Sequence, residues 1–166
     1  MPLKNPFSPC LWFDNQAQQA AEFYIGIFDN SKIIGTTHYG EAGFEIHQRP
    51  AGSVMSVIFE LDGQRFTALN GGLVFTFNEA VSLQVFCDNQ MQLDHYWEQL
   101  SAGGDPAAQQ CGWLKDRYGV SWQILPTLLQ ENALRGSNDP AQNDRVMTAI
   151  LQMKKLDIAT LQKAFG

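Results

Sequence analysis

The stretch C-G-W-L-K-D-R-Y-G-V-S-W-Q-I-L-P, residues 111–126, has the pattern of a strand, a tight turn and a second strand. Asp116 and Gly119 supply turn chemistry, because Asp can accept hydrogen bonds from its own backbone and Gly tolerates positive φ. On the outgoing strand, alternation separates an apolar face from a mixed one. The first face holds Val120, Trp122 and Ile124, and the second holds Ser121, Gln123 and Leu125. Pro126 ends the ladder.

The same plan occurs earlier in the chain. Strand patterns at residues 10–13, 33–37, 53–61 and 65–69 surround a helical pattern that begins near residue 17, and Asp62-Gly63 is a hairpin-turn signal. A second series starts with a strand at 83–87 and a helix opened by residues 88–90. Residues 39–52 contain Gly and Pro at several positions, which favours a long loop or an irregular strand.

A fixed offset relates the two series. Asp14, Asn15 and Gln18 match Asp88, Asn89 and Gln92 at a separation of 74 residues. Each pair of Asn and Gln is typical of a helix start, with Asn15 and Asn89 as the N-caps. Residues 63–69 also match 119–125, at a different separation, and this match sets Phe66 opposite Trp122. The repeat predicts two βαβββ modules in an α+β fold.

We expect module one at residues 2–72, module two at 78–127 and a helical tail at 138–166, all within one domain of 166 residues. Each module's sheet exposes an apolar face that it cannot cover alone, so the two modules must pair. In the tail, Asp139-Pro140 is a helix start and Asp157 caps a last short helix. The tail either packs on its own chain or reaches a second subunit, and the sequence leaves both open.

Composition excludes several classes of protein. Apolar residues make up 45% of the chain, which is enough for a packed core and opposes disorder. A net charge of −6 opposes binding to nucleic acid or to an anionic membrane. The three cysteines are far apart, which fits a reducing cytosol, and there is neither a secretory signal nor a bilayer-length apolar run. We therefore expect a cytoplasmic protein.

Several segments carry a family resemblance. They are L-W-F-D-N (11–15), G-Q-R-F-T-A-L-N-G-G (63–72), F-N-E-A (77–80), Y-W-E-Q-L (96–100), residues 111–126 and R-V-M-T-A-I-L-Q-M-K-K-L-D-I (145–158). With them the chain resembles the PhnB-like branch, the "3-demethylubiquinone-9 3-methyltransferase" domain family, of the glyoxalase/bleomycin resistance/dioxygenase (vicinal oxygen chelate) superfamily. The resemblance implies paired βαβββ modules around a cup, and a homodimer that in some relatives exchanges modules.

Enzymes of that superfamily hold a divalent metal with one His or Glu from each of four strands. By the resemblance, the four positions here fall on Ser8, Thr67, Ser82 and Gln123. Neutral hydroxyls and one amide cannot offset the desolvation of a dication, so we expect neither a metal nor another cofactor there. The histidines offer no alternative pair, since His38 and His47 lie near the module-one loop and His95 on the solvent side of a helix.

Two residues are candidates for catalysis. Cys111 shares a strand face with Trp113 and Lys115, and a nearby cation can activate a thiol; the alternative is an inert buried Cys. Glu79 precedes the first strand of module two and is either a general base or a solvated linker residue. Methyl transfer, which the family description suggests, has no support, because no G-x-G-x-x-G-like turn is present.

These observations leave three hypotheses for function. The first is a metal-free protein that binds an unidentified small molecule through the polar groups of Thr67, Ser82 and Gln123 and an apolar wall. The wall candidates are Trp12, Phe59, Trp113 and Trp122, and each of them could instead be core. The second is a lyase, isomerase or dioxygenase of the same superfamily, with or without a metal. The third is a dimeric interaction module.

Overall fold

The computed structural model describes residues 7–134, 136 and 139–166. The chain divides into two compact units, residues 1–76 and residues 77–166, and each is described by itself. The start of the predicted module one, residues 2–6, and the first residue of the predicted tail, Asn138, lie outside the described residues.

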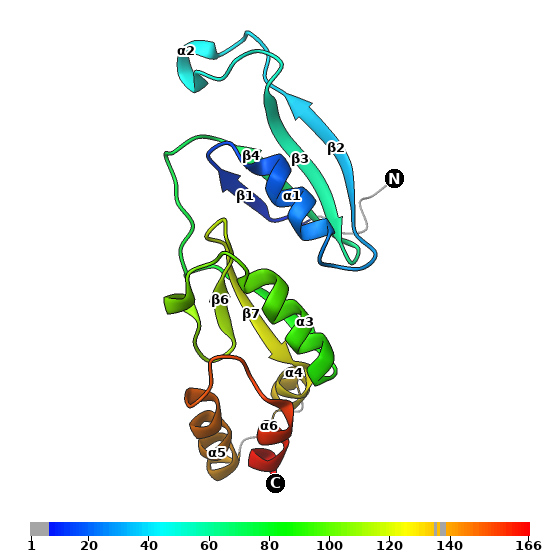
Figure 1. Ribbon diagram of the computed structural model, residues 1–166, viewed down its shortest axis with the longest axis vertical. Coiled ribbons are helices and arrows are strands. Elements are labelled where there is room, and N and C mark those ends of the chain that lie inside the picture. Colours follow the sequence, from blue (N-terminus) through cyan, green and yellow to red (C-terminus); the bar gives the residue numbers. More distant parts are fainter. Residues whose placement is uncertain (1–6, 135, 137–138) are drawn as a thin grey trace. The chain divides into compact units, whose positions relative to one another are not determined.

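The first unit has the predicted βαβββ order (Figure 1). Its elements are β1 (Cys10–Phe13), α1 (Ala17–Ile25), β2 (Lys32–His38), α2 (Phe44–His47), β3 (Val54–Leu61) and β4 (Gln64–Asn70). The sheet order is β1-β4-β3-β2, with β1 parallel to β4 and the other neighbours antiparallel. Asp62 and Gly63 both have positive φ, 44° and 80°, which is what a tight two-residue hairpin requires. The short helix α2 lies within the stretch predicted to be a loop.

Helix α1 covers one face of this sheet (Figure 1). Ala17, Ala20 and Ala21 are fully buried and small, so the helix backbone can approach the strands closely. Tyr24 on the same stripe stacks against Phe59, with ring centroids 6.2 Å apart. Phe59 is fully buried, and it is therefore a core residue and not a wall of an open cavity.

The prediction that Asn15 caps α1 is wrong. The residue before the helix is Gln16, and it provides no side-chain cap. The backbone N–H of Ala17 instead donates to Oδ1 of Asn70, at 2.8 Å, and Nδ2 of Asn70 donates to the Val54 carbonyl, at 3.0 Å. Asn70 stands at the end of β4, beside the end of β1. A strand residue 53 positions away thus does the work expected of a local cap.

The second unit is built from three strands within the described residues, one fewer than predicted. Its elements are β5 (Leu83–Cys87), α3 (Gln90–Ser101), the 3₁₀ turn η1 (Pro106–Ala108), β6 (Trp113–Lys115), β7 (Ser121–Pro126), α4 (Thr127–Leu134), α5 (Pro140–Leu151) and α6 (Ile158–Phe165). The order is β5-β7-β6, with β5 parallel to β7. Residues 103–112 lack a regular strand because they contain three glycines and a proline, and Gly103, Cys111 and Gly112 have positive φ.

Helix α3 covers one face of this second sheet (Figure 1). It buries Leu93, Trp97 and Leu100. The strands contribute Leu114, Trp122 and Ile124 to the same core. The predicted cap is confirmed, because Oδ1 of Asn89 accepts from the Gln92 N–H, at 3.0 Å.

The tail has the predicted helix starts. Asp139 accepts from the Ala141 N–H at 3.0 Å, and Asp157 accepts from the Thr160 N–H at 2.7 Å. The segment between α5 and α6 is bonded to its own module: the Cys111 N–H donates to the Met153 carbonyl and the Gly112 N–H to the Lys154 carbonyl, each at 2.8 Å. Helix α4 was not predicted. No helix in the described residues has both the length and the apolar character that crossing a membrane demands.

Candidate functional site

A cavity of about 450 Å³ opens on the second unit. It lies between the link that precedes β5, the turn η1 and the strands β6 and β7. Its lining consists of Glu79, Ala107, Ala108, Gln110, Cys111, Trp113, Leu114, Lys115 and Ser121. Three of the residues singled out from sequence, Glu79, Cys111 and Trp113, therefore share one cavity. Its volume falls within the range of small-molecule sites.

Strand alternation places the side chains at this cavity. Leu114 is almost completely buried in the core, so its neighbours Trp113 and Lys115 occupy the opposite face of β6. The antiparallel register sets Trp113 beside Gln123 and Lys115 beside Ser121. Cys111 precedes the strand with a φ of 54°, and its backbone N–H is held by the tail.

An ion pair spans part of the cavity wall. Nζ of Lys115 pairs with Oε1 of Glu79, and the Lys115 side chain is 25% exposed whereas that of Glu79 is 62% exposed. The hydrogen bond from Lys115, helped by one from the backbone of Glu79 itself, lowers the pKa of the Glu79 carboxyl. A carboxylate with a lowered pKa is a weaker base, so the pairing suits Glu79 better as a partner of Lys115 than as a general base.

A row of polar side chains runs along β5 and β7. Nε2 of Gln123 donates to Oγ of Ser82, at 2.7 Å, and Nε2 of Gln84 lies 3.4 Å from Oε1 of Gln123. Gln84 and Gln123 are also register partners in the parallel pair. Ser82 and Gln123, two of the four positions where the resemblance places metal ligands in other members of the superfamily, are thus hydrogen-bonded to each other.

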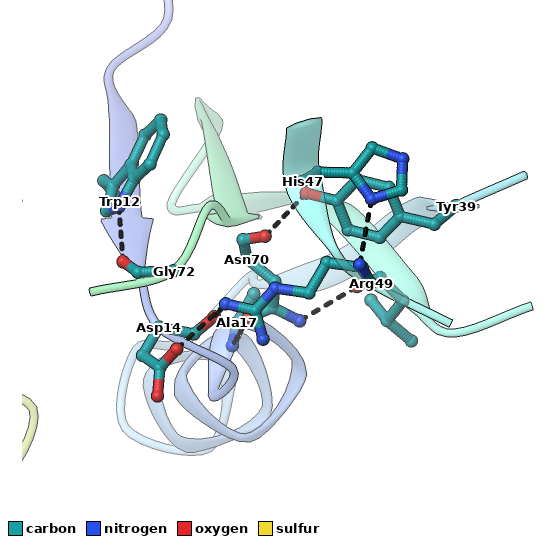
Figure 2. Close-up of polar contacts among 9 residues, drawn as sticks. Trp12, Asp14, Ala17, Tyr39, His47, Arg49, Asn70 and Gly72 are labelled. Carbon is teal, nitrogen blue, oxygen red and sulfur yellow. Dashed lines mark hydrogen bonds and ion pairs between the residues drawn. The ribbon is translucent and has the colours of Figure 1, made fainter. Parts of the chain in front are cut away.

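Thr67 and Trp12, the remaining ligand-binding candidates of module one, belong to the first unit. Thr67 is half-buried in β4, next to Cys10 of β1. Nε1 of Trp12 donates to the Gly72 carbonyl at 2.8 Å (Figure 2). The indole also meets the Phe75 ring edge-on, with centroids 5.0 Å apart. The indole also lies so close to Gly71 that a Cβ there would overlap it.

Trp122 lies in the core of the second unit and is 2% exposed. Its Nε1 donates to Oδ2 of Asp116 at 2.8 Å. Oδ1 of the same carboxylate accepts the backbone N–H groups of Tyr118 and Val120. The predicted turn chemistry of Asp116 is confirmed, and the carboxylate has the further task of satisfying a buried indole.

The histidines do not come together with other ligands. His95 is exposed on α3, and His47 stacks on Tyr39 with ring centroids 4.5 Å apart. Among the described residues, no three His, Cys, Asp or Glu side chains are placed to share a metal ion. At Ser8, Oγ donates to the Arg65 carbonyl at 3.2 Å, a contact that needs no metal.

Sequence reasoning missed a second cavity, of about 260 Å³, in the first unit. It contains Arg49, whose guanidinium pairs with Asp14 at 2.9 Å (Figure 2). The two residues lie 35 positions apart, and Arg49 belongs to a stretch with no periodic pattern. No local signal could have joined them.

Comparisons with known proteins place these features in a family. The family model described as 3-demethylubiquinone-9 3-methyltransferase matches residues 5–125. A search of curated proteins found no match.

Several solved structures are similar to this chain. A PhnB protein from Bacillus cereus, described as a 3-demethylubiquinone-9 3-methyltransferase, is 32% identical, with 73% of this chain and 99% of that chain covered and a TM-score of 0.60. Protein PA1353 from Pseudomonas aeruginosa is 16% identical, with 74% and 98% covered and a TM-score of 0.56. FosX, a fosfomycin resistance protein from Listeria monocytogenes, is 16% identical, with 78% and 97% covered and a TM-score of 0.48. The chain therefore belongs to the PhnB-like 3-demethylubiquinone-9 3-methyltransferase domain family.

Proposed function

We propose that this PhnB-like protein binds a small organic molecule in the cavity of its second unit and that binding needs no metal ion. The observation that carries the proposal is the combination of an aromatic wall, Trp113, with one cation, Lys115, in a cavity of about 450 Å³. Ligand sites are commonly built from an apolar lining and a small number of polar groups that fix orientation.

The ion pair suggests how a ligand is held. Glu79 is mostly exposed and belongs to the link before β5, whereas Lys115 is mostly buried on a strand. A ligand oxygen can take the place of the Glu79 carboxylate on Lys115 with little loss, because an ion pair with an exposed carboxylate is screened by water and contributes little. Trp113 then supplies apolar contact area to the body of the ligand.

The metal-free part of the proposal depends on the chemistry of the donors. At the four positions where the resemblance places metal ligands, Ser8, Thr67, Ser82 and Gln123 offer only hydroxyls and an amide, which do not offset the desolvation of a dication. None of the four lines the cavity, and in its lining only Glu79 and Cys111 could offer a metal a charged group.

The test is a thermal-shift screen of the full chain with EDTA present, followed by calorimetric titration of any hit. Libraries of aromatic acids, quinones and sugar phosphates cover the chemistry of the lining. We expect a saturable ligand whose affinity falls about tenfold in Lys115→Gln, as for the loss of one charge-assisted hydrogen bond. Lys32→Gln is the matched control, because Lys32 is an exposed lysine of the first unit. Silence across the libraries, or binding that requires added metal, would contradict the proposal.

A second candidate function is a metal-free lyase or isomerase that uses the same cavity. It is favoured by the presence of the Cys111 thiol and the Glu79 carboxylate in one lining. Turnover of a bound ligand that is lost in both Cys111→Ser and Glu79→Gln would support it; turnover that survives both changes would not. Methyl transfer is not proposed, because neither sheet is the doubly wound parallel sheet of common methyltransferases. The homodimer and the cytoplasmic location stay predictions.

A further inference from the structure

We propose that the cavity of the first unit is a second binding site, for a small molecule that presents a carboxylate to Arg49. The cavity measures about 260 Å³ and lies where α1 begins and β4 ends. It is separate from the cavity of the second unit and shares no residue with it. Its polar lining comprises the guanidinium of Arg49, three amide side chains at or just before the start of α1, and two residues from the strand side: Asn15, Gln18, Gln19, Ser53 and Asn70.

Arg49 is fixed in position before any ligand arrives. Its Nη2 donates to the carbonyl of Asp14, at 2.8 Å, and to Oδ1 of the same residue, at 2.9 Å. Its backbone N–H donates to Nδ1 of His47, at 3.0 Å. Figure 2 shows the side chain reaching from the loop after α2 across to Asp14. A side chain held in this way has already lost most of its rotamer entropy, so a ligand does not have to order it.

Most of the guanidinium remains available. A guanidinium carries five N–H donors in one plane, and Asp14 engages only those on Nη2. Within the described residues, Nε and Nη1 of Arg49 make no hydrogen bond, and the side chain is 23% exposed. Planar donors in this arrangement match the two oxygens of a carboxylate, and such charge-assisted bonds are stronger than neutral ones.

The surroundings favour a ligand with several polar groups. The amides of Asn15 and Gln19 make no hydrogen bond within the described part of the chain, whereas the amide of Gln18 donates to Glu22 at 2.9 Å on the exposed side. Asn70 already accepts from the Ala17 N–H and donates to the Val54 carbonyl. The free amides can pair with hydroxyl, amide or further carboxylate groups of the ligand.

Charge and size limit the ligand class. Asp14 neutralises Arg49, so the net field at the cavity is weak, and the positive end of the α1 dipole adds a small attraction for anions. A cavity of about 260 Å³ lies just below the usual range for drug-sized ligands. We therefore assign the site to small mono- or dicarboxylates and not to a nucleotide.

The experiment is a titration of the full ¹⁵N-labelled chain, followed by NMR through the Arg49 Nε–H and the backbone N–H signals of Gln18 and Gln19. The probes are succinate, its neutral analogue succinamide, and inorganic phosphate. We expect saturable shifts at these signals with succinate alone. Arg49→Lys keeps the charge beside Asp14 but not the fork of donors, and we expect it to bind succinate about tenfold more weakly. Lys32→Gln, outside the cavity, should bind as the parent does.

Each other outcome contradicts the proposal. Equal shifts with succinamide, or shifts with phosphate alone, would overturn the carboxylate assignment. Unchanged affinity in a folded Arg49→Lys chain would remove Arg49 from the site. If that variant is unfolded, Gln19→Ala decides, because Gln19 is exposed and its loss should weaken succinate severalfold without harming the fold. Signals of Trp113 and Lys115 in the same spectra report on the other cavity, so the failure of one site is distinct from failure of the other.

Discussion

The two units share one strand topology but stabilise it with different residues. In each, the first strand runs parallel to the last strand, and the registers are related by the sequence offsets: Cys10 faces Thr67, and Gln84 faces Gln123. The hairpins differ at the turn. In the first unit Leu61 faces Gln64 across a two-residue turn, whereas in the second the N–H of Asp116 donates to the carbonyl of Val120 across a longer one. The backbone plan is repeated, and the chemistry that stabilises it is not.

The open faces differ in the same way. Glu60 of the first unit faces Arg65 across the hairpin and pairs with it at 3.4 Å. The position one step before the turn in the second unit is Lys115, which faces Ser121. Lys115 therefore has no charged neighbour across the hairpin and pairs with Glu79 from the link. The first unit thus has an ion pair between neighbouring strands, Glu60 and Arg65, at the position where the second unit has Lys115 at a cavity.

The largest effect is expected from exchanging the residues that start the two turns. Asp116→Leu removes the acceptor for Trp122 Nε1 and for two backbone N–H groups in a site that is 2% exposed. Buried donors without partners are costly, so we expect a loss of about 3 kcal/mol or more in the free energy of unfolding, measured by urea denaturation. Asp116→Asn, which keeps an acceptor, is the control and should lose less.

The reciprocal change, Leu61→Asp, should be about as costly, because it buries a carboxylate without donors to receive it. If either exchange were tolerated with less than about 1 kcal/mol lost, the turns would be interchangeable and the contrast between the two units would be wrong.

A smaller effect is expected at the two helix starts. Asn70→Ala leaves the Ala17 N–H and the Val54 carbonyl unpaired in a buried place, and we expect a loss of about 2 kcal/mol. Asn89→Ala removes a local, exposed cap and should lose about 1 kcal/mol. Denaturation gives the totals, and hydrogen exchange at the first turns of α1 and α3 locates them. Equal losses in both variants would mean that the cap from β4 brings no extra stability.

The smallest effect concerns the ionisation of Glu79. Lys115→Gln removes the hydrogen bond that lowers the Glu79 pKa, so that pKa should rise toward the ordinary value for Glu. Because the folded pKa is lowered, the pairing stabilises the fold above the ordinary Glu pKa, and this stabilisation is lost as the pH falls through the lowered value. Carboxyl ¹³C chemical shifts during a pH titration measure it.

Asp94 provides the internal reference for that titration. Hydrogen bonds from Lys155 and Gln90 lower the pKa of its carboxyl, and Lys115 takes no part in them. Lys115→Gln should leave the Asp94 titration unchanged, whereas Lys155→Gln should raise the Asp94 pKa and leave Glu79 alone. If the Glu79 pKa were the same in Lys115→Gln as in the parent, the ion pair would not form in solution.

Much of this architecture follows from local sequence. Alternation placed β3, β4, β5 and β7 within one or two residues, because a half-buried strand must alternate. The offset of 74 residues predicted the second helix and its cap. This was possible because Asn89 accepts from the backbone N–H of Gln92, only three residues away. Cys111 and Trp113 could be singled out because they stand together just before one turn, and Glu79 because it precedes the first strand of module two; the structure brings all three to one cavity.

What local sequence missed depends on distant contacts or on competing signals. Nothing near Asn15 reveals that Asn70 takes its place as the cap. Likewise, no local pattern around Arg49 indicates that it forms an ion pair with Asp14. Helix α4 follows Pro126 directly, and a proline that ends a strand reads as the start of a loop. The missing strand of the second unit reflects φ values at Gly103 and Gly112 that a regular ladder cannot hold.

The hydrogen bonds between the tail and the residues before β6 have a consequence for any protein that binds the tail. The carbonyls of Met153 and Lys154 hold the backbone of Cys111 and Gly112, and Cys111 is part of the cavity wall. A partner that displaced α5 or α6 on binding would shift that wall and change the affinity for the ligand. A ligand in the cavity would change the affinity for the partner by the same free energy. Binding of a partner to the C-terminal helices would then change the affinity of the cavity for its ligand, through the backbone bonds of Met153 and Lys154.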